Sequence, residues 1–397
     1  MQGPWQRAPD GQPHRSGGNM RIAFDAHMVG SRETGNEVYA RNIASAMARA
    51  GKNHEMVIFV TRPSALTEAR ALPNCSLVAV PSSPFLRLGL AIPYQVWHRK
   101  ADLLHVTYVA PPILGKPFVV TVHDVSFERF PEFFGLRDLA VLKSLVPMTV
   151  RRAHRVIAVS HFTKQEIIDV YRIPESKVVV IHEAADATLG PYPQASEIDR
   201  VRAKYGIHGE YILYVGNIQK RKNIARLLRA FSAVQARSDL PLQLVVAGQE
   251  TGRAEHLGEI ERNLCRQGQV RFLGFVPQED MAPLYSGALV FAYPSLYEGF
   301  GLPVVEAMAC GTPVLTSNSS ALAEVAGDSA MLVDPLSVED IARGLLTIVT
   351  DADLRHRLSN AGRENVCRFS WETSARKTLE VYEQVMSESH HPKVRNR

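Results

Sequence analysis

Short runs of apolar, mostly β-branched residues alternate along this chain with longer amphipathic segments. Many of the runs lack the polar alternation of a half-exposed strand, and near-continuous apolar runs are typical of a parallel sheet that is covered on both faces. The pattern predicts strands in two series, at 21–24, 57–60, 77–80, 103–106, 118–122, 156–159 and 178–181, and then at 211–215, 242–247, 270–272, 289–292, 314–316 and 331–333.

Helical segments separate the predicted strands. The segment 34–50 repeats apolar residues every four positions and is followed by Gly51, a typical residue just after a helix end; Asn223 is expected to cap a later helix. Strands and helices that alternate in two sets predict an α/β chain with two doubly wound, Rossmann-like domains facing a cleft. We place these domains at 20–190 and 206–370, after a flexible tail at 1–19, with the boundary in the Pro- and Gly-containing stretch 189–209.

Composition narrows the class of protein. A chain of 397 residues with 46% hydrophobic and 21% charged residues is typical of a folded, two-domain globular protein. The net charge of +5 suits an anionic ligand or membrane surface but is too small and dispersed to indicate nucleic acid binding. The four cysteines show no metal-ligand spacing, the start of the chain lacks the apolar core of a signal peptide, and no run is long enough to span a membrane. We therefore expect a cytoplasmic protein with free thiols.

Two carboxylates, Glu298 and Glu306, have seven residues between them and flank a Gly-rich loop. Glu298 follows a predicted strand, Pro303 suits the first position of a helix, and Gly311 is expected to end that helix. A helix start with free N–H groups favours a phosphate, while the carboxylates can accept hydrogen bonds from sugar and ribose hydroxyls. The alternative is an ordinary acidic loop before a helix.

Three consecutive cations, Lys220, Arg221 and Lys222, follow the predicted strand at 211–215 after Gly216 and Asn217. A guanidinium fork and an ammonium point charge both suit a diphosphate. A solvated basic loop is the alternative. Asp351 and Asp353 superficially resemble a metal-binding pair, but they are expected at a helix start, where acidic residues favour the dipole, and no metal site is predicted.

Three weaker patterns also follow predicted strands. His123 stands at the carboxyl end of a strand, where ligands of open α/β sheets bind, although a lone histidine is more often structural. The loop 30–36, which includes Gly35, can bring backbone N–H groups near an anion but is not the glycine pattern of a dinucleotide oxidoreductase. Thr163 and Glu166 have the spacing of a capping box and are interpreted as a helix start.

The string 298–306 resembles the Glu-x7-Glu motif of retaining GT-B glycosyltransferases, in their large family four. The resemblance covers about 20–385 and includes the strings 155–160 and 368–371. It implies transfer of a hexose from a nucleotide-sugar donor, with no cofactor and no metal, to a glycan or lipid-linked acceptor. It also implies that the last helix, at 371–388, crosses back onto the first domain.

The resemblance assigns roles to the motif residues. Arg221 and Lys222 would hold the diphosphate, Glu306 the ribose, and Glu298 with His123 the sugar. The remaining donor contacts would come from Gly35, Asn217, Gly274, Phe275, Val276, Phe300, Gly301 and Leu302. Substitution of Glu298 is accordingly expected to slow transfer while sparing binding of the free diphosphate. Many family members carry an arginine where this chain has Asn217, and the Arg-Lys-Asn string resembles a branch that often transfers mannose, so GDP-mannose is weakly preferred.

Other enzyme classes and other partners stay open at this point. A nucleotide-sugar epimerase, a phosphorylase-like enzyme and a non-catalytic nucleotide-sugar-binding protein would share the fold. The segments 84–100 and 130–155 mix aromatic, aliphatic and basic residues; they either rest on the inner face of a membrane and meet a lipid-linked acceptor, or are ordinary packed helices, the slightly favoured interpretation.

Overall fold

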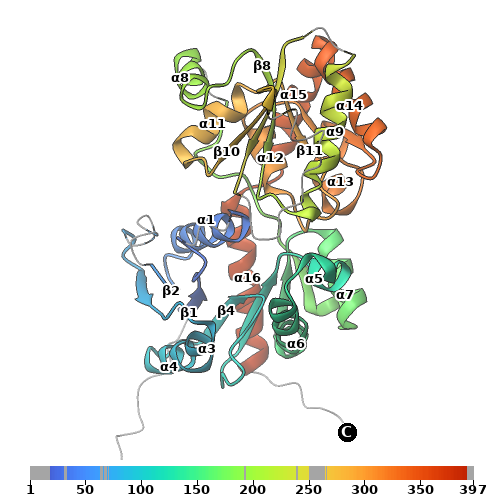
Figure 1. Cartoon of the computed structure of the whole chain (residues 1–397). Helices are drawn as coiled ribbons and strands as arrows, with labels where there is room; N and C mark the ends of the chain where they lie inside the picture. The colour runs from blue at the N-terminus through green and yellow to red at the C-terminus, as the bar shows by residue number, and fades with distance from the viewer. Residues whose placement is uncertain are drawn as a thin grey trace, which may run out of the picture.

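The computed structural model describes residues 18–30, 34–62, 66, 69, 71–191, 194–237, 240–249, 264 and 266–390. The expected tail therefore falls outside the described residues up to position 17, as do residues 31–33 of the loop before the first helix. Figure 1 shows two α/β domains, one above the other, with the final helix α16 running alongside the first domain.

The described part of the first domain holds a seven-stranded parallel sheet in the order β3-β2-β1-β4-β5-β6-β7. All five residues of β4 and of β5 are buried, and most of them are apolar, as a sheet covered on both faces requires; His105, Thr107 and Thr121 are the polar exceptions. The strands are β1 (Arg21–Asp25), β2 (Glu55–Val60), β3 (Cys75–Ala79), β4 (Leu103–Thr107), β5 (Phe118–Val122), β6 (Arg155–Ala158) and β7 (Val178–Val180). The helices are α1 (Thr34–Ala50), α3 (Pro84–Leu86), the π-helical turn η2 (Arg87–Ala91), α4 (Ile92–His98), α5 (Ser126–Arg129), η3 (Pro131–Phe133), α6 (Leu136–Arg152), α7 (His161–Tyr171) and η4 (Glu175–Lys177).

The described part of the second domain holds a six-stranded parallel sheet in the order β10-β9-β8-β11-β12-β13. Its strands are β8 (Glu210–Val215), β9 (Leu242–Ala247), β10 (Val270–Gly274), β11 (Val290–Tyr293), β12 (Val314–Ser317) and β13 (Met331–Val333). Its helices are α8 (Ala195–Tyr205), η5 (Lys220–Lys222), α9 (Ile224–Gln235), α11 (Gln278–Ser286), α12 (Leu302–Ala309), α13 (Ser320–Ala326), η6 (Gly327–Ser329), α14 (Val338–Thr350) and α15 (Ala352–Val366).

The two-domain α/β fold predicted from the apolar runs is confirmed, since each predicted run coincides with a strand to within two residues at either end. The stretch expected to be a boundary differs, because it contains α8. This helix packs against α11, and the buried carboxylate of Asp280 accepts hydrogen bonds from Arg200, Lys204 and Tyr205 of α8. Residues 195–205 therefore belong to the second domain.

The final helix α16 (Trp371–His390) belongs to the core of the first domain. It packs against α1, and its buried side chains, among them Tyr382, join those of β1 and α1 in one apolar cluster. The indole N–H of Trp371 donates to the carbonyl of Ala185 at 2.9 Å. The chain thus crosses back from the second domain and ties its own end to the first (Figure 1).

Candidate active site

The cationic and acidic motifs meet because the strands before them are neighbours. In each sheet the strand order reverses direction beside the first strand, and ligands of open α/β sheets bind at that point, beyond the carboxyl ends of the strands. In the second sheet this point lies between β8 and β11, which pair with Val290 opposite Ile212. The loop after β8 carries Arg221 and Lys222, and the loop after β11 carries Glu298.

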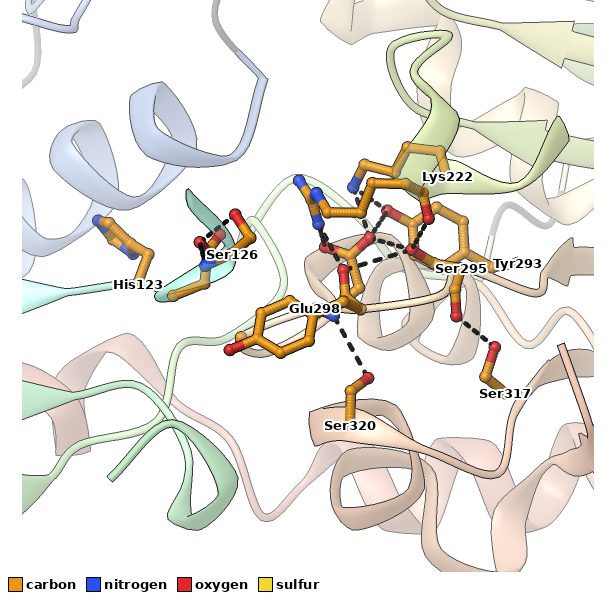
Figure 2. A network of polar contacts seen from close by, with 12 residues as sticks. His123, Ser126, Lys222, Tyr293, Ser295, Glu298, Ser317 and Ser320 are labelled. Atoms are coloured by element: carbon orange, nitrogen blue, oxygen red, sulfur yellow. Dashed lines mark hydrogen bonds and ion pairs between the residues drawn. The ribbon is translucent and has the colours of Figure 1, made fainter. Parts of the chain in front are cut away.

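Glu298 lies at the centre of a buried polar cluster (Figure 2). One carboxylate oxygen accepts from the Arg221 guanidinium at 2.8 Å. The other accepts from the Lys222 ammonium at 2.7 Å and from the Ser295 hydroxyl at 2.6 Å. The Tyr293 hydroxyl also donates to this second oxygen at 3.1 Å. The sequence analysis expected Arg221 and Lys222 to bind a phosphate and Glu298 to bind a sugar. In the structure the two cations bind Glu298 instead.

The electrostatics of this cluster join two cations to Glu298, which is in direct contact with both, and to Asp124, whose charge also acts on both cations. Desolvation by burial opposes ionisation of Glu298, but Arg221 and Lys222 outweigh it and lower the pKa of Glu298 to about 2. Burial lowers the pKa of Lys222 to about 8, against the opposing pull of Glu298. Arg221 is buried too, and Glu298 holds its pKa above the ordinary value. Two cations in contact with one carboxylate can still attract a further anion.

Glu306 is the fifth residue of α12, and its environment differs from that of Glu298. Its carboxylate accepts from the Tyr285 hydroxyl at 2.9 Å, and burial raises its pKa to about 7. The start of α12 corrects one expectation: Leu302 is the first helical residue and Pro303 the second, after Gly301 with φ 105°. Gly311 follows the helix end with φ 76°, as predicted.

The loop between Ser295 and Gly301 also forms the contact with the first domain. The carbonyl of Gly299 accepts hydrogen bonds from the hydroxyls of Ser160, at 2.6 Å, and Thr163, at 2.9 Å. A Cβ atom at position 299 would lie 1.7 Å from the carbonyl oxygen of His123, so only glycine permits this approach. Tyr297 reaches further and donates to Glu166 at 3.1 Å.

The side chains of Phe300 and Leu302 pack into the core of the first domain. Phe300 is 3% exposed and contacts the rings of His182 and Phe369. Of these two predicted donor-binding residues, only the backbone is therefore available to a ligand, and the side chains join the two domains.

His123 directly follows β5, and one of its ring nitrogens has a partner while the other has none within the described chain. Its Nδ1 is 2.8 Å from a carboxylate oxygen of Glu183, while the buried Nε2 has no hydrogen-bond partner within the described chain. The rings of Tyr39 and Tyr108 flank the imidazole. The Glu183 contact fixes the ring, so Nε2 is the atom that a ligand can meet. Figure 2 shows His123 to one side of the Glu298 cluster.

The remaining predicted donor residues lie at the edges of this region. Asn217 is half-buried directly after β8. Gly35, at the start of α1, comes close to the start of α12: a Cβ there would lie 4.0 Å from Leu302 Cδ1. Gly274 has φ 67° at the end of β10, followed by half-exposed Phe275 and buried Val276.

Two local expectations are wrong. Asn223 precedes α9 in the left-handed conformation, with φ 63°, and makes no side-chain cap; its amide donates to the carbonyls of Pro294 and Pro335. Thr163 and Glu166 do lie at the start of a helix, α7, as predicted, but the capping-box assignment is wrong, because Ser160 is the cap and accepts from the Thr163 N–H at 2.9 Å. Asp351 does cap a helix, α15, as predicted.

Sequence reasoning missed several residues that complete the site. Ser295 and Tyr293 hold Glu298, Tyr285 holds Glu306, and Glu183 holds His123. Ser295 and Tyr293 end or follow a strand directly before the acidic motif, which is a usable signal. The partners of Glu306 and His123 come from other elements and no sequence spacing marks them.

Family models of glycosyltransferases match both domains of this chain. Residues 197–365 match the family model "Glycosyl transferases group 1", and residues 34–189 match "Glycosyltransferase Family 4". The chain is 33% identical to O-antigen chain mannosyltransferase B of Escherichia coli over 66% of this chain and 69% of that protein. It is 32% identical to the serotype-specific mannosyltransferase WbdA of Escherichia coli over 60% of this chain, but only 30% of WbdA is covered.

Solved structures share the fold along nearly the whole chain. Sucrose-phosphate synthase from Thermosynechococcus elongatus superposes with a TM-score of 0.72 at 22% identity, covering 93% of this chain and 99% of that one. Anabaena HepE in complex with UDP-glucose also gives 0.72, at 20% identity, covering 92% and 100%. No helix among the described residues is long and apolar enough to cross a membrane. From the family models that match both domains, from the O-antigen mannosyltransferase relative and from the GT-B architecture, we conclude that this chain belongs to the family 4, group 1 glycosyltransferases.

Proposed function

We propose that this glycosyltransferase transfers a hexose with retention of anomeric configuration from a nucleoside-diphosphate sugar, without a metal ion. The observation that carries the proposal is the buried cluster of Arg221, Lys222 and Glu298, which holds two cations against one carboxylate beside the start of α12. A diphosphate is an anion that both cations can bind, and the helix start favours the same ligand.

In this proposal each polar group of the site meets one part of the donor. Arg221 and Lys222 bind the diphosphate, and Glu306 accepts hydrogen bonds from the ribose hydroxyls. Glu298 and the free Nε2 of His123 face the hexose. Asn217, the backbone of 300–302, Gly35 and the segment 274–276 complete the donor contacts.

The proposed reaction breaks the bond between the anomeric carbon and the diphosphate oxygen while the acceptor hydroxyl attacks from the same face. Negative charge grows on the departing oxygen, and the two cations stabilise it more in the transition state than in the ground state. The leaving diphosphate takes the proton of the acceptor hydroxyl, so the products are the glycosylated acceptor and the protonated diphosphate. The two cations thus supply the positive charge that a bound metal ion supplies in metal-dependent enzymes.

GDP-mannose is the donor we propose to test first. Two relatives that are about a third identical to this chain over the aligned residues are named mannosyltransferases, and the chain carries the Arg-Lys-Asn string after β8. A thermal-shift screen of nucleotide sugars identifies the donor, because a ligand that binds only the folded state raises the unfolding temperature. Transfer by the stabilising donor should persist in EDTA; activity that EDTA abolishes and manganese or magnesium restores would contradict the metal-independent mechanism.

Absorbance and turnover of the donor that the screen selects separate the rival functions. An epimerase would convert the donor without an acceptor, and a phosphorylase-like enzyme would show the absorbance of covalently bound pyridoxal phosphate. A non-catalytic binding protein would be stabilised by the donor without any transfer or hydrolysis.

For the acceptor, we propose a lipid-linked glycan met at the inner face of the membrane. Five large side chains of α3, η2 and α4 are exposed rather than packed, among them Phe85, 83% exposed, and Trp97, 72% exposed. These side chains are Phe85, Leu86, Leu90, Tyr94 and Trp97. Beside them opens a cavity of about 590 Å³, lined mainly by apolar side chains and by Asn36, Thr107 and Tyr108. Aromatic and aliphatic groups on a surface helix insert into the interfacial region of a bilayer.

The acceptor proposal is tested by introducing negative charges on this exposed apolar face. The double substitution Phe85→Glu and Trp97→Glu should abolish co-sedimentation with anionic vesicles and leave nucleotide binding intact. Co-sedimentation equal to that of the unsubstituted protein would show that this face does not meet the membrane.

A further inference from the structure

A second cluster of ligating side chains lies at the domain contact, outside the donor site. One ring nitrogen of His161, one of His182 and a carboxylate oxygen of Glu324 all lie within 4.8 Å of one another. His161 begins α7 and His182 follows β7, both in the first domain, whereas Glu324 stands on α13 of the second domain. The loop that carries Phe300 separates this cluster from Glu298, since the Phe300 ring packs against His182.

The carboxylate of Glu324 is already fixed in place. Its two oxygens accept hydrogen bonds from the backbone N–H groups of His161 and Phe162, each at 2.9 Å, at the start of α7. The imidazole Nε2 of His182 lies 3.3 Å from one of these oxygens. Each carboxylate oxygen has a second lone pair, so it can ligate an ion while it keeps its backbone donor. A hydrogen-bonded carboxylate is typical of metal ligands in proteins.

The spacing fits a small transition-metal ion. Two ligands at about 2.1 Å from a tetrahedral ion lie roughly 3.4 Å apart. The His182–Glu324 distance of 3.3 Å already meets this value. The exposed ring of His161 has only to turn on its own side-chain bonds to complete the set. Two imidazoles and one carboxylate favour Zn²⁺ and related ions over Mg²⁺ or Ca²⁺, which prefer oxygen ligands.

We propose that His161, His182 and Glu324 form a Zn²⁺-class metal site that bridges the two domains, with a water molecule as the fourth ligand. Because the ligands come from both domains, the ion holds the domains in contact and slows the separation that product release requires. The site is regulatory: bound zinc lowers turnover and takes no part in the chemistry at the diphosphate.

The direct test is a calorimetric titration of Zn²⁺ into the EDTA-treated full chain, which needs neither donor nor acceptor. The variant His161→Ala removes an exposed ring, and His356→Ala, on the exposed side of α15, is the matched control. His161→Ala should weaken the bridging site by at least the roughly 10–100-fold that loss of an outer-shell partner costs, because it removes a direct ligand. His356→Ala should bind as the unsubstituted chain does, and tetrahedral absorbance of bound Co²⁺ should disappear only in His161→Ala. Equal stoichiometry and affinity in all three proteins would overturn the proposal.

Glu324→Gln provides an independent variant, because its amide oxygen still accepts a backbone N–H of α7 while the charged ligand is lost. It should lose the same equivalent of zinc as His161→Ala and retain the unfolding temperature of the metal-free protein to within a few degrees. Zinc binding that survives this substitution would also overturn the site.

The domain-bridging consequence has its own readout in the transfer assay. Saturating Zn²⁺ should lower kcat of the unsubstituted enzyme and leave kcat of His161→Ala unchanged, a comparison that removes any effect of zinc on the free donor. If zinc fills the site and kcat does not fall, the ion does not restrain the domains. A protein that binds zinc in this way but transfers no sugar would leave the metal site intact and refute only the proposed transferase function.

Discussion

Replacing Glu298 with glutamine removes the one negative charge that both buried cations share. The ordinary pKa of 4.5 falls to about 2 at this carboxylate. At about 1.4 kcal/mol for each pKa unit, this lowering corresponds to about 3 kcal/mol of stability. Because the folded-state pKa is depressed, that stability is present above pH 4.5 and is lost as the pH falls towards 2.

At neutral pH the substitution should lower the free energy of unfolding by about 3–5 kcal/mol, the range for removing one partner of a buried ion pair. About 3 kcal/mol corresponds to roughly 6–12 °C in the unfolding temperature of a domain of this size.

The same substitution should tighten, not spare, the binding of a free nucleoside diphosphate. In the unliganded protein Glu298 competes with phosphate oxygens for Arg221 and Lys222, and glutamine competes less. The sequence alone predicted unchanged binding; the hydrogen bonds of the folded cluster change that expectation. Transfer should still fall strongly, because Glu298 is proposed to face the sugar.

Differential scanning fluorimetry with and without nucleoside diphosphate measures both effects. Glu339→Gln is the control, since its pair with Arg237 is 69% exposed on the glutamate side and such exposed pairs contribute little to stability. A Glu298→Gln protein as stable as the control, or one that the diphosphate stabilises less than the unsubstituted chain, would refute the account of the cluster.

Four further outcomes are expected. Glu306→Gln should raise the free energy of unfolding above pH 7 by up to about 3 kcal/mol, because burial raises the pKa of the Glu306 carboxyl to about 7 and its ionised form destabilises the fold. Calorimetry should show that the same substitution weakens diphosphate binding. Diphosphate affinity should fall as the pH rises through 8, where Lys222 loses its proton, and a pH-independent affinity from 7 to 9.5 would contradict this. Gly299→Ala should abolish transfer while sparing diphosphate binding, whereas Gly190→Ala, with open space around it, should change neither. His123→Ala should lower kcat with little change in diphosphate affinity, so a loss confined to binding would reject its place beside the sugar.

The fold was predictable because both sheets are covered on both faces. Strands such as β5, buried at every position, must be mostly apolar, and helices between them must carry one apolar face. The placement of the two motifs was predictable for a related reason: loops that follow strands at the carboxyl edge of a sheet are where such folds bind ligands.

The contacts within the site were not predictable, because they join residues that no spacing relates. Arg221 and Glu298 are 77 positions apart, and His161 and Glu324 are 163 apart. Predictions from residue type and motif position also failed at residues whose tertiary contacts determine where the side chain lies. Asn223 has the residue type of a helix cap, but its side-chain amide donates hydrogen bonds to the carbonyls of Pro294 and Pro335. Phe300 belongs to the motif loop, yet its ring lies in the core of the other domain.

The most direct test of the central claim is the anomeric configuration of the first-formed product, followed by proton NMR during transfer from the donor that the thermal screen selects. The account predicts that the new glycosidic bond has the configuration of the sugar in the nucleotide donor, and that Lys222→Ala forms the same anomer far more slowly. A product with the opposite configuration would contradict the retaining, diphosphate-assisted reaction at Arg221 and Lys222.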